Sequence, residues 1–202
     1  MARARNPAHR IALLEAAARV FAGEGLGAST ASIAREAGVS TGTLFVYFET
    51  KTALVNELYV VLKTEMGRAA TEGLRLDSSP REQLRSMWDR WIIWALDDPD
   101  KRRALAHLGV AEELSDDSRL AVRAAYAGIA EILERIVADG PMREVPLGFA
   151  STLMSVIADA TIDNLIASPD PTGTRSALAF DAMWRALAGR PDPAHTPAQE
   201  DP

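Results

Sequence analysis

The sequence predicts an all-α protein of about nine helices, arranged as a small three-helix head followed by a larger helical body. Three observations support this fold class. Apolar residues recur at helical spacing through most of the chain, and alternation of β-branched residues is nearly absent. Glycine and proline are concentrated between the periodic segments, where they end one helix and precede the next. A chain of 202 residues is also long enough to bury a substantial core.

Composition narrows the class of protein. Hydrophobic residues make up 48% of the chain and charged residues 25%, which is ordinary for a folded soluble protein. No apolar run approaches the length of a membrane span, so we expect no membrane partner. The chain has no cysteine, which excludes disulfides and thiolate metal sites and is compatible with a cytoplasmic location.

The first helix is expected from Pro7 to about Gly23. Asn6 can cap this helix, and proline suits its first position because the missing N–H is not needed there. Gly25 and Gly27 then interrupt the helical pattern.

Two short helices are expected within residues 29–51. A hydroxyl cap at Ser29 or Thr30 begins the first of them, and Gly38 stands where a helix stops in the left-handed conformation. Ser40 can cap the second. Two short helices around a tight glycine-containing turn form a helix-turn-helix, whose second helix lies in the major groove of DNA.

The segment from Gly38 to Lys51, GVSTGTLFVYFETK, resembles the signature of the TetR family of bacterial transcriptional regulators. The close match covers about residues 8–55, and the rest of the chain resembles the family in length and helical content. The resemblance implies a dimeric repressor that binds operator DNA and responds to a small molecule. The chain departs from the family pattern at Phe45, where a tyrosine is usual, and at Val46, where an aromatic residue is usual.

The first turn of the second short helix is expected to face base edges, because helix-turn-helix proteins read DNA there. Threonine can hydrogen-bond a base and touch a thymine methyl group, and Gly42 permits a close approach of the backbone. The alternative is that Ser40 and Thr41 only cap the helix. Tyr47 and Lys51 are expected to contact phosphates. The full set of expected DNA-contacting residues is Thr30, Ser40, Thr41, Gly42, Thr43, Phe45, Tyr47 and Lys51.

The charge of the chain is unevenly distributed. The whole chain carries −6, yet residues 1–55 hold six basic and four acidic side chains, a net charge of +2. Screening over about 10 Å hides distant acids from a phosphate backbone. A modest local charge favours two heads acting together and specific base contacts over nonspecific coating of DNA.

Six further helices are expected in the body. Residues 1–50 are predicted to form the DNA-binding domain, 51–189 the ligand-binding and dimerisation domain, and 190–202 a disordered tail. The expected helices span 51 to about 73, about 80–97, 102–113, 118–139, 147–167 and 174–188. Buried positions are expected at Val61 in the first of these, and at Leu120, Ala124, Ala127 and Ile132 in the fourth.

Three tryptophans lie within seven residues on one body helix. The alternatives are a place in the core and the lining of a ligand pocket, since aromatic walls with few polar groups suit apolar ligands. The resemblance places an inducer cavity among the fourth to seventh helices. The expected ligand-binding residues are Trp88, Trp91, Trp94, Met66, Met87, His107 and Tyr126.

The last two helices carry apolar stripes that could cover their own domain or pair with a second copy of the chain. The resemblance implies a four-helix dimer bundle, and small residues such as Ala158 permit close helix approach. The expected interface residues are Met154, Ile157, Ala158, Thr161, Leu165, Phe180, Trp184 and Leu187.

Catalysis has little support in the sequence, and we expect no enzymatic activity, cofactor or metal. No metalloprotease, nucleophile-elbow, phosphate-loop or dinucleotide motif is present. Asp159 and Asp163 share a helix face, for which a surface stripe or polar contact is favoured over a metal site. A helical carrier or enzyme with a protein-binding head, and an activator of the same fold, stay open as alternatives.

Overall fold

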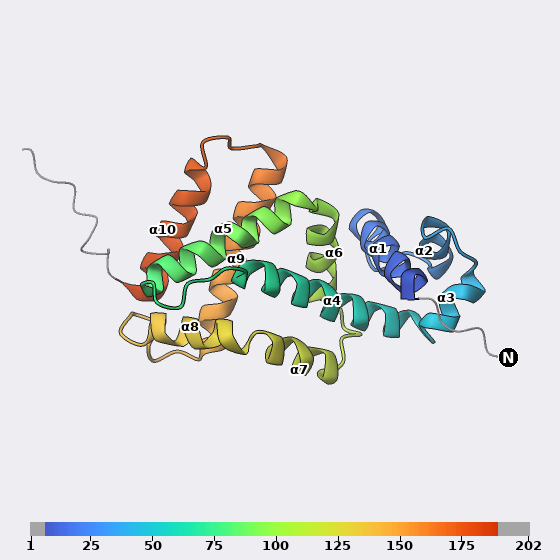
Figure 1. The fold of residues 1–202 in the computed structure, drawn as a ribbon, viewed down its shortest axis with the longest axis horizontal. Helices are drawn as coiled ribbons and strands as arrows, with labels where there is room; N and C mark the ends of the chain where they lie inside the picture. Colours follow the sequence, from blue (N-terminus) through green and yellow to red (C-terminus); the bar gives the residue numbers. More distant parts are fainter. Residues whose placement is uncertain (1–6, 190–202) are drawn as a thin grey trace, which may run out of the picture. The chain divides into compact units, whose positions relative to one another are not determined.

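The computed structural model describes residues 7–189, and this part of the chain forms ten helices and no strand (Figure 1). The predicted all-α class is therefore confirmed. The expected cap Asn6 and the expected tail at 190–202 lie outside the described residues. The helices are α1 Pro7–Glu24, α2 Thr30–Glu36, α3 Thr41–Tyr47, α4 Lys51–Thr71, α5 Pro80–Asp97, α6 Pro99–Gly109, α7 Asp116–Ala125, α8 Ala127–Val137, α9 Leu147–Ala167 and α10 Thr174–Ala188.

The described chain divides into two compact units. The first unit holds residues 7–68 and 97–126, and the second holds 69–96 and 127–189. The first unit thus contains the helix-turn-helix together with α6 and α7. The division expected at residue 50, which concerns function rather than contacts, stays a prediction.

The helix-turn-helix begins and ends at the residues that its local chemistry favours. Ser29 caps α2 by accepting the backbone N–H of Ser32, and Ser40 caps α3 by accepting that of Thr43, each at 3.0 Å. Gly38 lies between them with φ of 69°, a conformation that glycine adopts without steric cost. The caps thus fix the residues at which α2 and α3 begin.

The core of the first unit is built around α1, which contacts both α2 and α6. Phe21, Ile33 and Leu44 come from three successive helices and are fully buried. Their burial fixes α1, α2 and α3 to one another, so the unburied side of α3 is a stable surface.

The connection between α6 and α7 is bonded to α4 within the same unit. The Asn56 carboxamide donates to the carbonyl of Glu113 at 2.8 Å and accepts the N–H of Ser115 at 2.8 Å. Lys101 on α6 also pairs with Glu65 on α4 at 2.6 Å. These bonds make α4 and the ends of α6 and α7 one connected piece.

The single helix expected over 118–139 is wrong, because the chain breaks at Tyr126 into α7 and α8. The Tyr126 hydroxyl donates to the carbonyl of Lys63 at 2.9 Å, and its ring lies against Gly67. Burial raises the pKa of Tyr126, which keeps the hydroxyl protonated as a donor. A contact across 63 residues of sequence thus interrupts a locally continuous helical pattern.

Other expectations about the body also need correction. Helix α6 begins at Pro99 and ends at Gly109 rather than spanning 102–113, because Asp98 caps it by accepting the N–H of Lys101. Three positions expected to be buried are exposed: Leu120 and Ala124 on α7, which buries none of its residues, and Ala127 at the start of α8. Val61 on α4 is also exposed, whereas Ile132 is buried as expected.

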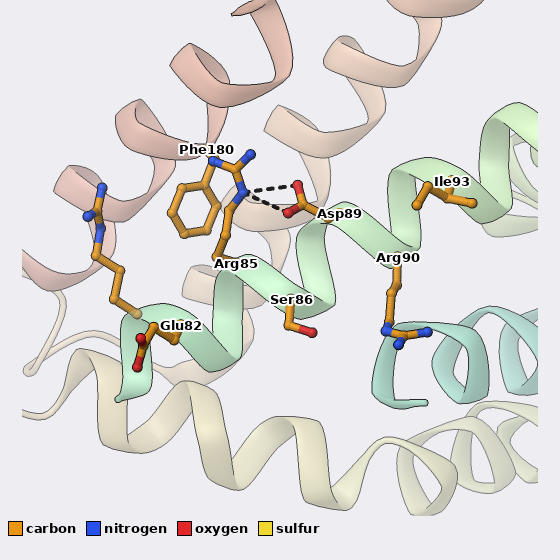
Figure 2. Close-up of a pocket in the computed structure, with 8 residues that line it drawn as sticks. Glu82, Arg85, Ser86, Asp89, Arg90, Ile93 and Phe180 are labelled. Atoms are coloured by element: carbon orange, nitrogen blue, oxygen red, sulfur yellow. Dashed lines mark hydrogen bonds and ion pairs between the residues drawn. The ribbon is translucent and has the colours of Figure 1, made fainter. Parts of the chain in front are cut away.

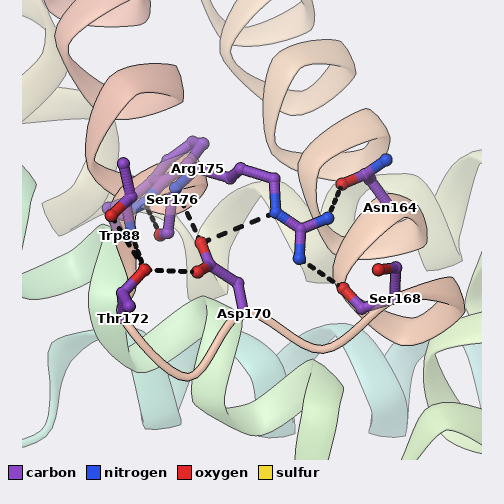
Figure 3. Close-up of polar contacts among 8 residues, drawn as sticks. Trp88, Asn164, Ser168, Asp170, Thr172, Arg175 and Ser176 are labelled. Atoms are coloured by element: carbon purple, nitrogen blue, oxygen red, sulfur yellow. Dashed lines mark hydrogen bonds and ion pairs between the residues drawn. The ribbon is translucent and has the colours of Figure 1, made fainter.

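The second unit contains α5, α8, α9 and α10, with α9 contacting both α8 and α10. The turn between α9 and α10 is held by polar contacts, as Figure 3 shows. Arg175 bonds the side chain of Asn164 and the carbonyl of Ser168, and Asp170 accepts the backbone N–H of Arg175. This turn therefore fixes the start of α10 relative to the end of α9.

By length and composition alone, α9 is apolar enough to span a membrane, and it is the one such helix among the described residues. This differs from the expectation that no run approaches that length. The helix carries Asp159 and Asp163 and contacts α8 and α10. A core helix of a soluble protein passes the same test, so the property is weak support for a membrane span.

Candidate functional site

The outward face of α3 is the candidate nucleic-acid interface. Leu44 is the residue of this helix that is buried, while Gly42, Phe45 and Val46 are exposed. Because Gly42 and Val46 are four residues apart, they lie together on the side opposite Leu44. The helix therefore presents a narrow, mostly apolar edge to its surroundings.

Two expected DNA contacts already have an internal role. The Ser40 hydroxyl accepts the backbone N–H of Thr43 and also hydrogen-bonds the Thr43 hydroxyl at 2.8 Å. Capping and base contact were alternatives for this turn, and the cap is present at Ser40. Thr41, the first residue of α3, is half-buried beside it.

Lys51 is turned towards its own domain. Its ammonium group donates to the carbonyl of Leu26 and lies 6.0 Å from the centre of the Phe21 ring. This bond ties the start of α4 to the loop between α1 and α2. An ammonium has three N–H groups, so one bond to a carbonyl leaves donors for a phosphate. The phosphate role stays a prediction.

The remaining expected DNA contacts lie at helix ends. Tyr47 ends α3, and its ring meets that of His9 edge-on at 6.2 Å. Thr30 is the first residue of α2. Sequence reasoning missed Arg35, which is exposed in the last turn of α2. Because the first helix of this motif crosses the phosphate backbone, an exposed arginine on it indicates a phosphate contact.

The tryptophans of α5 have different roles. Trp88 is 1% exposed, its indole N–H donates to the hydroxyl of Ser176 at 2.9 Å, and its ring meets Phe180 edge-on. It therefore belongs to the core of the second unit. Trp94 is also buried. Trp91 differs, because its indole N–H is buried and has no hydrogen-bond partner among the described residues.

The other expected ligand residues are divided between the two units. Met66 and Met87 are buried, and Tyr126 is half-buried with its hydroxyl bonded to Lys63. His107 is exposed on α6, and its ligand-binding role stays a prediction. Met66 and Tyr126 belong to the first unit and Met87 to the second.

The second unit has an open hollow of about 670 Å³ along the polar side of α5, as Figure 2 shows. Its arginines are paired with carboxylates: Arg85 with Asp89 at 2.9 Å, and Arg81 with Asp181 at 2.7 Å. The guanidinium of Arg85 also lies over the ring of Phe180. This paired charge offers little attraction to an anion, and the hollow is not the tryptophan-lined pocket expected from the sequence.

Half of the expected dimer contacts are unsuitable as surface residues. Four of them are buried inside the chain itself and cannot present a face to a partner: Ala158, Leu165, Phe180 and Leu187. The other four are half-buried: Met154, Ile157, Thr161 and Trp184. The exposed apolar side chains of α9 and α10 are instead Phe149, Val156 and Leu178. Val156 directly precedes Ile157, one of the expected contacts.

This arrangement is similar to that of known regulatory proteins. Residues 13–58 match the family described as bacterial regulatory proteins, tetR family. A putative tetR family transcription regulator from Shewanella sp. PV-4 is 27% identical, with a TM-score of 0.80 over 90% of this chain and 99% of that one. A TetR family transcription regulator from Marinobacter aquaeolei VT8 is 24% identical, with a TM-score of 0.80 over 91% and 97% of the two chains.

A more distant likeness is to the transcriptional regulator FadR from Bacillus subtilis, whose structure is a complex with stearoyl-CoA. It is 18% identical, with a TM-score of 0.65 over 90% of this chain and 100% of that one. Residues 13–58 are therefore similar to the helix-turn-helix of the TetR family of bacterial regulatory proteins, and nine tenths of the chain share the fold of a transcription regulator of that family.

Proposed function

We propose that the protein is a homodimeric, cytoplasmic repressor that binds a pseudo-palindromic operator and is released by a small, largely apolar ligand. The observation that carries this proposal is the exposed face of α3, held by caps at Ser29 and Ser40. A short helix that is capped in this way and exposed on one face can insert into a major groove.

The dimer part of the proposal is supported by the apolar side chains that α9 and α10 leave exposed. Phe149 and Val156 are seven residues apart on one face of α9, and Leu178 is exposed on α10. A twofold pair would set two recognition helices about 34–36 Å apart, one turn of DNA, which requires an operator with related half-sites.

The ligand part is supported by the indole N–H of Trp91, which is buried without an acceptor among the described residues. A buried donor without a partner is costly, and a ligand oxygen would supply the missing bond. The complex of B. subtilis FadR with stearoyl-CoA shows that a protein of this fold accepts a long apolar chain. Coupling of about 1–3 kcal/mol would change DNA affinity about 5- to 150-fold.

The test begins with selection of duplexes from a random-sequence pool by the full-length protein. Gel-shift titration of the selected and a scrambled duplex, over a range of salt concentrations, then separates base contacts from phosphate contacts. The proposal requires a dimer on the selected site and a clear preference over the scrambled one. Absence of any preference in low salt would contradict it.

A second set of titrations tests release. Small apolar compounds, with stearoyl-CoA among them, are added to the protein–DNA complex. Release by one of them, and loss of that release in Trp91→Phe, is expected. A helical carrier or enzyme would bind or convert such a compound without any specific duplex. An activator would bind the duplex, and a transcription assay on a promoter carrying the site distinguishes it from a repressor.

A further inference from the structure

The centre of the exposed face of α3 carries no side chain that can hydrogen-bond. Gly42 has no side chain, and Val46, one turn later, is apolar and 53% exposed. Phe45, beside them, is 44% exposed. A helix that reads bases with hydrogen bonds would place amide, guanidinium or hydroxyl groups at this centre.

The polar group next to this centre is already engaged. The Thr43 hydroxyl is hydrogen-bonded to the Ser40 hydroxyl at 2.8 Å, within the cap of the helix. Breaking that bond to reach a base would cost part of what the new bond supplies. The side chains at the centre of this face are therefore apolar, whereas the Thr43 hydroxyl beside them is held in the helix cap.

The glycine at position 42 has no explanation within the chain. Its φ is not positive, and a Cβ placed there would meet only the Ser40 hydroxyl oxygen, at an ordinary 3.7 Å. Glycine is nevertheless the least favourable helix residue apart from proline. The missing side chain leaves a notch beside Val46, which would let a flat base edge come close to the helix.

We propose that the face formed by Gly42 and Val46 recognises the 5-methyl group of thymine, so that each operator half-site carries a thymine against Val46. This inference rests on the proposed DNA-binding function and assigns its specificity. Thymine presents the one apolar group of the major groove, and valine gains by burying it. Cytosine at the same place has a hydrogen on C5 where thymine has the methyl group, so the valine would lose that apolar contact.

An apolar partner protein is the other possible occupant of this face. The match of residues 13–58 to bacterial regulatory proteins favours DNA, because it covers α3 and the helices that hold it.

The experiment replaces thymines by uracil, one position per half-site at a time, in a duplex selected from a random pool by the full-length protein. Uracil lacks the methyl group and keeps the base pairing. Affinities are measured for the wild-type protein and for Val46→Ala and Val46→Thr. At one position we expect wild-type binding about fourfold weaker per half-site for each methyl lost. Val46→Ala is expected to bind the thymine and uracil duplexes equally well.

The test is whether the effect of Val46→Ala on affinity depends on the thymine methyl group, as in a double-mutant cycle. Val46→Thr keeps the shape of the side chain and is expected to show an intermediate dependence on the methyl. Val61→Ala, an exposed valine on α4, serves as the matched control and should retain the full uracil effect. Because Val46 is exposed, we expect its variants to fold normally. Unfolding curves of each variant check this.

Two failures are distinguishable. If no duplex is selected at all, the proposed function and this inference fall together, and a protein partner becomes the occupant of α3. If a duplex is bound but no thymine-to-uracil change affects binding, or if Val46→Ala shows the same uracil effect as wild type, this inference alone is overturned.

Discussion

The hydroxyl of Ser40 accepts the backbone N–H of Thr43 at 3.0 Å and hydrogen-bonds the Thr43 side chain at 2.8 Å. One small side chain thus satisfies a free donor at the start of α3 and positions the residue beside its exposed face. Because α3 has only seven residues, losing one end affects the whole helix.

Ser40→Ala is therefore expected to lower the free energy of unfolding by about 1 kcal/mol, the usual cost of removing a helix cap. Urea denaturation followed by circular dichroism measures the difference. Ser40→Asp retains an acceptor at the cap and is the matched control. An equal loss in the aspartate variant would show that the cap is not the cause.

Gly42→Ala is expected to separate stability from DNA binding. The added methyl group meets no atom closer than 3.7 Å within the chain. Since alanine is favoured over glycine in a helix by about 1 kcal/mol, the unfolding free energy should stay the same or rise. Affinity for a selected duplex should fall, because the methyl group fills the notch beside Val46. Unchanged affinity would argue that no base edge approaches α3 there.

The indole N–H groups of Trp88 and Trp91 are expected to differ in their effect on stability. Ser176→Ala leaves the buried N–H of Trp88 without an acceptor and should cost about 1–3 kcal/mol of stability. Trp91→Phe removes an N–H that already lacks a partner among the described residues, so this part of its effect should be neutral or favourable. Thermal unfolding of both variants tests the contrast. If Trp91→Phe loses as much stability as Ser176→Ala, the prediction is wrong.

Val156→Asp is expected to produce a monomer if α9 and α10 form the interface. The side chain is 58% exposed within one chain, so the substitution should leave the fold intact, whereas pairing would bury an unpaired carboxylate. Sedimentation velocity reports the oligomeric state. Val110→Asp, at an exposed valine after α6, is the control and should stay dimeric. A dimer in both variants would place the interface elsewhere.

Glu57 gives a prediction for pH. Burial raises the pKa of this carboxyl, and Arg10 opposes the shift without cancelling it. A raised pKa in the folded state means that protonation favours folding, a contribution fully present below the unfolded pKa and lost as pH rises through the folded pKa. Glu57→Gln should therefore equal or exceed the wild type in stability at pH 7.

The advantage of Glu57→Gln should shrink as the pH falls through the raised pKa of Glu57 towards the ordinary value of a glutamate. Loss of the partner costs Arg10 little, because its side chain is about half exposed. Denaturant titrations at pH 7 and pH 4 compare the two proteins. A variant that is less stable at pH 7, with the gap closing in acid, would mean that the Arg10 pair outweighs burial.

Local sequence chemistry was sufficient where the cause of a structural feature lies within a few residues. The ends of α9 and α10 agree with the sequence prediction, as do the caps at Ser29 and Ser40 and the left-handed Gly38. In each case a proline, glycine or hydroxyl next to the helix supplies the reason.

Features that depend on distant partners were not predictable in this way. The break at Tyr126 depends on a carbonyl at Lys63, and the inward position of Lys51 depends on a carbonyl at Leu26. The expected dimer stripes contained Phe180 and Leu187, because periodicity identifies an apolar face without saying whether the chain or a second copy covers it.

The two hydrogen bonds of Asn56 restrict how long the α6–α7 connection can be. Its carboxamide spans Glu113 and Ser115, which are separated by the single residue Leu114. An insertion or deletion there would break one of these two bonds, so variation in length should be confined to other loops. The spacing of these two backbone groups thus sets the number of residues between α6 and α7.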